Sequence, residues 1–368
     1  MTRFLLRFAT AALTFFAVLS CGNVPAQAEQ GLVDHAAGST VYQWRSAGSF
    51  KVVRGVTDAV AVNEGNYGGA AMNSDGTVTL WGVPWGSKEP FLVHGFQNVI
   101  QLTNGNDDYA ALESNGTVWM VGQEVGGDFG NGVESGIYAT AVEVPDLPDN
   151  IVQIAGGADH MLALARSGQV YAWGVNADDA LALPKKGTGY SSPVVDPPLT
   201  ALTDGTSTAV EIAGGSDFAA MLVNRTAYTW GNNGEGQCGC GSAASIVASP
   251  VRVEQPVDFT SISSGGGNGS DGIDVALGVN GHAYCWGDDA DGECGQGSLA
   301  PTRVPTLVPG LPSLTQASAG GQWSCYLDAA GSVWTAGYHE GGTTVREQFT
   351  SGISMVWAGA GSGLALGD

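Results

Sequence analysis

Six times along the chain, the same pattern of glycines and short apolar strands recurs. Each unit has a Gly-Gly-type loop, an apolar strand, a tight turn and a strand that closes on Trp-Gly or a related pair. The closing glycines are Gly82, Gly122, Gly174, Gly231, Gly287 and Gly337. Strands and turns repeated about every 50 residues predict a β-propeller or a related β array.

Residues 151–183 show how one unit is built. Ile151–Ala155 and Met161–Ala165 are apolar runs of strand length, and a glycine loop separates them. Ser167-Gly168 predicts a tight turn, after which Gln169–Trp173 runs back as a third strand. A fourth strand per unit is expected in the looser stretches, such as 88–94 or 248–254.

The last unit is incomplete, and its missing strand lies at the other end of the chain. Residues 355–366 supply two strands, whereas the pattern of 38–44 matches the third strand at 76–81. An N-terminal strand that completes the C-terminal blade closes the ring and removes its free edges. The sequence therefore predicts an all-β fold, a single seven-bladed β-propeller that spans residues 38–368.

The N-terminus has the pattern of a secretory signal peptide. Arg3 and Arg7 precede the apolar run Phe8–Leu19, and Ala26-Gln27-Ala28 is a small-residue cleavage site. We expect a signal peptide at 1–28, a short tail at 29–37 and an exported protein. A lipid anchor on Cys21 is the alternative, and no later stretch is predicted to span a membrane.

The charge of the mature chain restricts its partners. Removal of Arg3 and Arg7 leaves 11 of the 13 Lys and Arg residues against 35 Asp and Glu, a net charge of −24. Such a charge repels nucleic acid and anionic lipid and favours a partner with a basic surface. We expect a monomer that binds a protein and no nucleic acid.

Three stretches resemble the regulator of chromosome condensation repeat. They are 154–174, with Ile-Ala-Gly-Gly-Ala-Asp-His and a closing Trp-Gly, and the two glycine-rich runs at 230–239 and 286–295. The resemblance covers nearly all of the mature chain and implies a seven-bladed propeller that binds proteins. Members of that family include a guanine nucleotide exchange factor on chromatin, ubiquitin-ligase scaffolds and photoreceptors. Secreted bacterial members, such as the propeller-type β-lactamase inhibitory protein, block an enzyme.

Strand alternation places two sets of loops at one end of the ring, namely those after Gly-Gly and those after Trp-Gly. Aromatic residues among carboxylates at this end suit a protein interface, with aromatic anchors and acidic steering groups. The structural alternative is that the aromatics pack between blades and the acids only solvate loops. The candidate residues are Tyr67, Trp85, Asp107, Asp108, Tyr109, Asp159, Asp178, Asp179, Asp217, Phe218, Asp288, Asp289, Asp291, Trp323, Tyr338 and His339.

The chain lacks the motifs of catalysis and of cofactor binding. No nucleophile elbow, P-loop or dinucleotide fingerprint stands in a strand–helix context. His160 belongs to the repeat pattern, for which a structural hydrogen bond is expected. The acidic run Asp288–Glu293 departs from the calcium-loop pattern at Gly287, so a variant repeat loop is favoured over a cation site. We expect no enzymatic activity, no cofactor and no metal.

Five cysteines remain after export, an odd number: Cys238, Cys240, Cys285, Cys294 and Cys325. Cys238 and Cys294 replace the leucine of the repeat, so we expect both to be buried as small apolar groups. Cys285 and Cys325 lie on strands of successive units. The sequence does not define their connectivity.

The sequence predicts an exported, non-catalytic protein-binding propeller, in the form of an inhibitor of a secreted or periplasmic enzyme. A glycan-binding lectin or a propeller hydrolase is the alternative, because aromatics and acids around a ring also suit sugars. A guanine nucleotide exchange factor or chromatin binder is disfavoured by the signal peptide and the negative charge.

Overall fold

The structure is a computed structural model. It describes residues 39–367 except 46–49, 84, 185–188, 204–209, 267–271, 339–341, 348 and 350–351. The predicted signal peptide and tail lie outside the described residues and stay predictions. Among the described residues, no helix has the length and apolar character that crossing a membrane requires.

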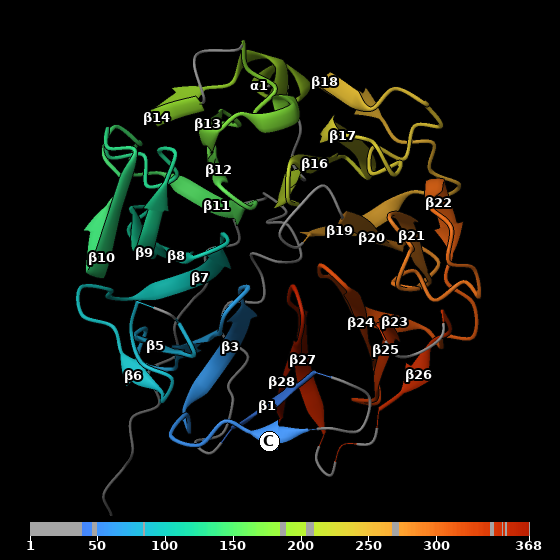
Figure 1. The fold of residues 1–368 in the computed structure, drawn as a ribbon, viewed down its shortest axis with the longest axis horizontal. Helices are drawn as coiled ribbons and strands as arrows, with labels where there is room; N and C mark the ends of the chain where they lie inside the picture. The colour runs from blue at the N-terminus through green and yellow to red at the C-terminus, as the bar shows by residue number, and fades with distance from the viewer. Residues whose placement is uncertain are drawn as a thin grey trace, which may run out of the picture.

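The described residues form seven four-stranded antiparallel sheets, arranged as blades around a central axis (Figure 1). The fold matches the predicted all-β, seven-bladed propeller. Blade 1 contains β3 (Ala59–Glu64), β4 (Gly69–Asn73), β5 (Val78–Trp81) and β6 (Phe91–Leu92). Blade 2 contains β7 (Val99–Asn104), β8 (Asp108–Glu113), β9 (Val118–Val125) and β10 (Ser135–Glu143). Blade 3 contains β11 (Ile151–Gly156), β12 (His160–Ala165), β13 (Val170–Val175) and β14 (Gly189–Val195). Blade 4 contains β15 (Val210–Gly214), β16 (Phe218–Val223), β17 (Thr226–Asn232) and β18 (Ile246–Arg252). Blade 5 contains β19 (Phe259–Gly266), β20 (Gly272–Gly278), β21 (Ala283–Gly287) and β22 (Thr302–Leu307). Blade 6 contains β23 (Leu314–Ala319), β24 (Trp323–Asp328), β25 (Val333–Gly337) and β26 (Val345–Arg346). Blade 7 contains β27 (Ile353–Ala358), β28 (Gly363–Gly367), β1 (Thr40–Trp44) and β2 (Lys51–Val52), and α1 (Pro197–Thr203) and the 3-10 helix η2 (Ala177–Asp179) lie in connections.

The two ends of the chain share blade 7, as predicted. Strand β1 pairs antiparallel with β28, with Val41 opposite Leu366, and β2 pairs with the outer side of β1. In Figure 1 the blue N-terminal strand lies beside the red C-terminal strands. The N-terminus therefore supplies both outer strands of this blade, one more than the pattern predicted. The fourth strands expected near 88–94 and 248–254 are confirmed as β6 and β18.

The core consists of seven hydrophobic clusters of described residues, each at an interface between neighbouring blades. Three of the four Trp-Gly tryptophans join blades through their indole N–H groups, whereas Trp81 Nε1 is buried without a hydrogen-bond partner. Trp173 Nε1 donates to Asp128 O at 2.7 Å, Trp230 Nε1 donates to Ala180 O at 2.8 Å, and each acceptor lies in the preceding blade. Burial of the ring and satisfaction of its donor explain why tryptophan suits this position.

The glycine of each Trp-Gly pair is required by the backbone. All six closing glycines have positive φ, for example 98° at Gly174. A Cβ at Gly174 would lie 2.5 Å from Asp159 O, in the loop between the first two strands of the same blade. Glycine permits both the left-handed conformation and this close approach.

A glutamine on several innermost strands bridges to the next blade. The Gln153 side chain donates to Ile212 O at 3.4 Å and accepts from Ile212 N at 3.1 Å. Equivalent side chains, Gln101 and Gln316, make the same paired contacts with residues 154 and 356. Blade 4 has Glu211 at this position, which accepts from Ile262 N through one oxygen and leaves the other buried without a hydrogen-bond partner.

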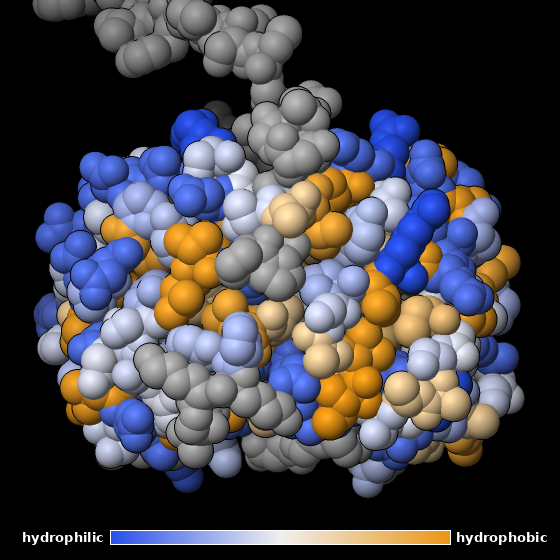
Figure 2. Space-filling model, turned by 90° about the horizontal axis from the view of Figure 1, so that it is seen from above, coloured by the Kyte–Doolittle hydropathy of each residue, from blue (hydrophilic) through white to orange (hydrophobic). Residues whose placement is uncertain are grey.

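The outer wall of the ring is a mixed surface. Figure 2 shows this wall edge-on, with hydrophobic residues interspersed among hydrophilic ones. Exposed apolar side chains of the outermost strands include Ile137, Ile246 and Leu307. They lie on different blades, so these side chains do not form one continuous apolar face.

Candidate protein-binding face

The two predicted sets of loops do share one end of the ring, which we call the loop face. In blade 3, Val175 N, just after Trp-Gly, donates to Asp159 O in the loop between the first two strands, at 2.7 Å. Blade 4 repeats this contact between Asn232 N and Asp217 O at 2.8 Å, and blade 6 between Tyr338 N and Gln322 O at 3.1 Å. The tight turns between second and third strands lie at the opposite end of each blade.

Three predicted aromatic anchors are buried, so they are not exposed contact residues. Phe218 and Trp323 begin the second strands of their blades, Tyr109 is the second residue of β8, and each is at most 2% exposed. The Tyr109 hydroxyl accepts from Gly65 N at 3.3 Å and donates to Gly68 O at 2.5 Å in the neighbouring blade. At this position the side chain fills the space between blades, as the structural alternative expected. Alternation along a strand does not reveal that packing.

Three predicted acids are also buried. Asp108 accepts from Gly105 N at 3.1 Å, and burial raises its pKa to about 7. Asp289 accepts from Cys294 N at 2.8 Å, whereas Asp288 Oδ1 accepts from Ala290 N at 3.1 Å. Their carboxylates satisfy loop backbone groups and are not available to steer a partner. Asp291 is half-buried in the same loop and accepts from Gln322 Nε2 at 3.1 Å.

Two tyrosines remain exposed at the loop face. Tyr67 is 48% exposed and Tyr338 is 43% exposed. Trp85 is half-buried and donates from Nε1 to Asp107 O at 2.8 Å. Tyr67, Trp85 and Asp107 line one shallow crevice between blades 1 and 2. His339 lies outside the described residues.

Asp107, Asp159 and Asp217 form an acidic row across blades 2 to 4. The pKa of each is raised, primarily by burial, and Asp159 raises the pKa of both neighbours. Asp178 raises the pKa of Asp217 further, to about 6. Among the described residues, no cation lowers any of these three pKa values.

Side-chain hydrogen bonds order this row. Asn66 Nδ2 donates to Asn106 Oδ1 at 2.6 Å, and Asn106 Nδ2 donates to Asp159 Oδ1 at 3.1 Å. Asp178 lies in η2, where Asn232 Nδ2 donates to it at 2.6 Å, and Asp179 follows it, half-buried. Amides of neighbouring blades therefore hold Asp159 and the adjacent Asp178 in place.

A central channel opens at the loop face and is lined by the first strands of the blades. Its lining includes Glu64, Asn66, Asn104 and Trp357. Burial raises the pKa of Glu64 to about 7, although Gln43 and Ser362 donate to this carboxyl. The sequence analysis did not select Glu64. The available signal was its position, because the units of blades 3 and 4 have a glycine, Gly156 and Gly214, where blade 1 has Glu64.

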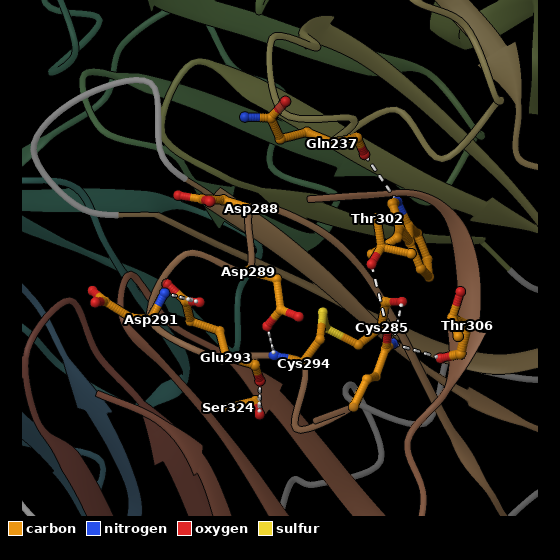
Figure 3. The surroundings of a disulfide bond; sticks show 12 residues. Gln237, Cys285, Asp288, Asp289, Asp291, Glu293, Cys294, Thr302, Thr306 and Ser324 are labelled. Carbon is orange, nitrogen blue, oxygen red and sulfur yellow. Dashed lines mark hydrogen bonds between the residues drawn. A yellow bond between two sulfur atoms is a disulfide. The ribbon is translucent and has the colours of Figure 1, made fainter. Parts of the chain in front are cut away.

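Cys285 and Cys294 form a disulfide in blade 5, with their Cα atoms 5.3 Å apart. Figure 3 shows it beneath the acidic loop 288–293. The expected burial of Cys238 and Cys294 is confirmed, and the pairing that the sequence left open joins Cys294 to Cys285 because the loop after Trp-Gly folds back beside β21. Cys238 is a free thiol, Cys240 is half-buried and free, and Cys325 is buried.

Among the described residues, no group of three or more His, Cys, Asp or Glu side chains is placed to hold a metal ion. Burial lowers the pKa of His160 to about 4, and its Nε2 has no hydrogen-bond partner, in contrast to the structural bond expected for it.

Comparison with known proteins gives matches to repeat models and to whole propellers. The model described as Regulator of chromosome condensation (RCC1) repeat matches residues 226–268 and 280–327, and a second model of that description matches 151–178. E3 ubiquitin-protein ligase HERC2 of Homo sapiens is 33% identical over 196 residues, which are 51% of this chain and only 4% of that protein.

Two solved structures share the complete ring. The crystal structure of Prp20p from Saccharomyces cerevisiae, described with its binding to Gsp1p and histones, has 20% identity and a TM-score of 0.75 and covers 94% of this chain and 95% of that chain. Yeast RCC1 (Prp20) bound to Kap60 has 20% identity and a TM-score of 0.78, with 99% and 96% coverage. At this identity the likeness shows the fold, and relatives with this propeller bind proteins.

Proposed function

Because the chain carries RCC1 repeats and folds into a seven-bladed β-propeller, we propose that it is an exported, non-catalytic protein-binding propeller. Its partner has a basic surface and binds at the loop face. The specific form that we propose is an inhibitor of a secreted or periplasmic enzyme.

The observation that carries this proposal is the acidic row beside exposed tyrosine. No described Lys or Arg lowers the pKa of Asp107, Asp159 or Asp217, and Tyr67 and Trp85 line the crevice at one end of the row. Tyrosine and tryptophan supply rigid contact area, whereas carboxylates steer a basic partner and select against acidic ones. Prp20p, a propeller of the same fold, binds proteins, which supports protein binding by this chain as well.

Two observations support export. The first 28 residues have the pattern of a signal peptide. The disulfide between Cys285 and Cys294 suits an oxidising compartment, since such bonds rarely persist in the cytosol. Expression in a bacterial host, with fractionation and N-terminal sequencing, tests export directly. An uncleaved chain in the cytosol would contradict it.

Affinity capture from culture supernatant and periplasm tests the binding face. We expect a partner whose affinity falls as ionic strength rises, because exposed charges are screened within about 8 Å at 0.15 M salt. Tyr67→Ala and Asp159→Asn should each weaken binding by about tenfold, the effect of a hot-spot loss of about 1.4 kcal/mol. Asp149→Asn is the matched control, because Asp149 is exposed beside the tight turns at the opposite end.

The captured partner is then assayed as an enzyme with and without the propeller, in a panel that includes β-lactamases. Inhibition at stoichiometric concentrations supports the inhibitor form. Equal binding by Tyr67→Ala, Asp159→Asn and the wild type, with no effect of salt, would show that the loop face is not the interface. A glycan array with a clear hit and no captured protein would favour the lectin alternative.

A further inference from the structure

The mouth of the central channel combines polar and apolar groups in an uneven way. The channel has a cavity volume of about 130 Å³, enough for several water-sized groups. On one side its lining is small or apolar, with glycines, alanines and the isoleucines of successive first strands. On the other side, at blades 7, 1 and 2, it contains Glu64, Asn66, Asn104 and Trp357.

Glu64 has an unused hydrogen-bonding oxygen at this mouth. The residue is 2% exposed, and both of its side-chain donors, Gln43 Nε2 and Ser362 Oγ, bind the same oxygen, Oε1. Oε2 is buried and has no hydrogen-bond partner. A buried polar atom without a partner destabilises the fold, so a ligand that donates to Oε2 would recover that lost free energy.

Glu64 is held rigidly where blade 7 meets blade 1. Gln43 comes from β1 and Ser362 from the loop between β27 and β28, so the closing blade orients the carboxyl. Gly359 packs against the Glu64 stem, where a Cβ would come within 2.8 Å of it. Such support fixes the carboxyl and makes it suitable for binding a ligand.

Trp357 adds an aromatic surface to the same channel. It lies on β27, which packs against β3, the strand that ends at Glu64. An indole ring is the best aromatic partner for an ammonium or guanidinium group. A carboxyl and an indole in one cavity, with no Lys or Arg among the lining residues, match the chemistry of a cation and not of an anion.

We propose that the channel mouth receives a lysine or arginine side chain of the partner protein, with its cationic group on Glu64 Oε2 and its alkyl stem along Trp357. The inference rests on the proposed protein-binding function and names the group that the loop face recognises. The acidic row supports it, because Asp107, Asp159 and Asp217 guide a cation toward the channel and repel carboxylates and phosphates. Asn66 and Asn104 line the same mouth and supply amide oxygens for the remaining N–H groups.

Two peptides test the chemistry: the blocked tripeptide Gly-Lys-Gly and its isostere with norleucine in place of lysine. Affinities are measured by isothermal titration calorimetry, and in the ¹⁵N-labelled full-length protein the indole N–H signal of Trp357, assigned with Trp357→Phe, reports binding at the channel. We expect saturable shifts with the lysine peptide and none with norleucine. Glu64→Gln should weaken the lysine peptide at least fivefold, whereas Glu113→Gln, a buried carboxyl at the opposite end of blade 2, should leave it unchanged.

Trp357→Leu provides a second variant in case Glu64→Gln does not fold, and it should weaken the peptide severalfold. Equal shifts with lysine and norleucine, or an unchanged affinity in both variants, would overturn the proposal. Spermidine tests whether the site binds a free amine in place of a protein side chain. If spermidine binds more than tenfold tighter than the peptide while the captured partner binds Glu64→Gln normally, the site serves free amines and the proposed occupant is wrong.

Binding assays with the captured partner distinguish a failure of the channel site from a failure of the proposed protein-binding function. Loss of binding in Tyr67→Ala with full binding in Glu64→Gln would reject the channel site and keep the loop face. Full binding in both variants would reject the loop face. Loss in both variants, with a lysine or arginine of the partner cross-linked to the channel mouth, is the result that we expect.

Discussion

Replacement of Glu211 by glutamine should make the protein more stable at neutral pH. In blades 2, 3 and 6 a glutamine at this position donates to a carbonyl of the next blade and accepts from its N–H. Glu211 makes only the accepting contact, from Ile262 N at 3.3 Å, and its Oε1 is buried without a partner. An amide at 211 would complete the pair with Ile262, as Gln153 does with Ile212.

The expected gain in folding free energy follows from the ionisation of Glu211. Burial raises its pKa from 4.5 to about 8, so at pH 7 the folded protein holds a proton that the unfolded chain has lost. At about 1.36 kcal/mol per pH unit, protonation at pH 7 costs up to about 3 kcal/mol of folding free energy. Because the folded pKa is the higher one, this part of the stability is fully present below pH 4.5 and is lost as pH rises toward 8. Glutamine has no such dependence.

Thermal and urea unfolding at pH 4.5, 6 and 7 measure the difference. We expect Glu211→Gln to unfold about 5 °C higher at pH 7, from a gain of about 2–3 kcal/mol, and to gain almost nothing at pH 4.5. Gln153→Glu is the mirror control, which should lose a similar amount at pH 7 and less at pH 4.5. A Glu211→Gln protein that is no more stable at pH 7, or whose gain does not change with pH, would refute the reasoning.

Two further predictions concern the repeat geometry. In blade 4, Thr229 and Cys238 occupy the places of Cys285 and Cys294, and the Thr229 hydroxyl already donates to Cys238 O at 2.6 Å, so Thr229→Cys should form a second disulfide. Alkylation of the unfolded, unreduced variant should then label fewer thiols than in the wild type, and an additional labelled thiol would contradict the prediction. Gly174→Ala should destabilise by about 2–3 kcal/mol in urea unfolding, from backbone strain plus the clash with Asp159 O. Gly132→Ala, which has φ of 82° and open space around its Cβ, should cost only about 1 kcal/mol, and equal losses in the two variants would remove the clash from the explanation.

The fold was largely predictable because its determinants are local and repeated. The closing glycines have positive φ, and the Trp-Gly tryptophans 173, 230 and 286 donate to carbonyls of preceding blades, so the same residues recur at each site for the same reason. Ring closure was predictable for a related reason: the strand pattern of 38–44 matches that of 76–81. The second N-terminal strand, β2, has only two residues, which is too short for any alternation to be seen.

The disulfide was not predictable because it joins two positions of one unit through a loop. The repeat in blade 4 gives no hint of the pairing, since Cys238 has a threonine opposite it and stays a free thiol. Replacement of a packing leucine by cysteine looked like simple burial in both units. Only the distance between the strand and its returning loop distinguishes Cys294 from Cys238.

The candidate site was predictable as a face but not residue by residue. A repeat assigns each position to an end of a blade, yet a side chain at the loop end points either outward or into the next blade. Tyr109, the second residue of β8, and Trp323, the first residue of β24, are buried between blades, whereas Tyr67, two residues before its strand, is exposed. Departures from the repeat are more informative than residue type. Glu64 stands where blades 3 and 4 have Gly156 and Gly214, and its Oε2 is buried without a hydrogen-bond partner among the described residues. Oε1 joins the closing blade to blade 1 through Gln43 and Ser362, but Oε2 makes no contact of this kind, so its recognition role has to be sought in what enters the channel.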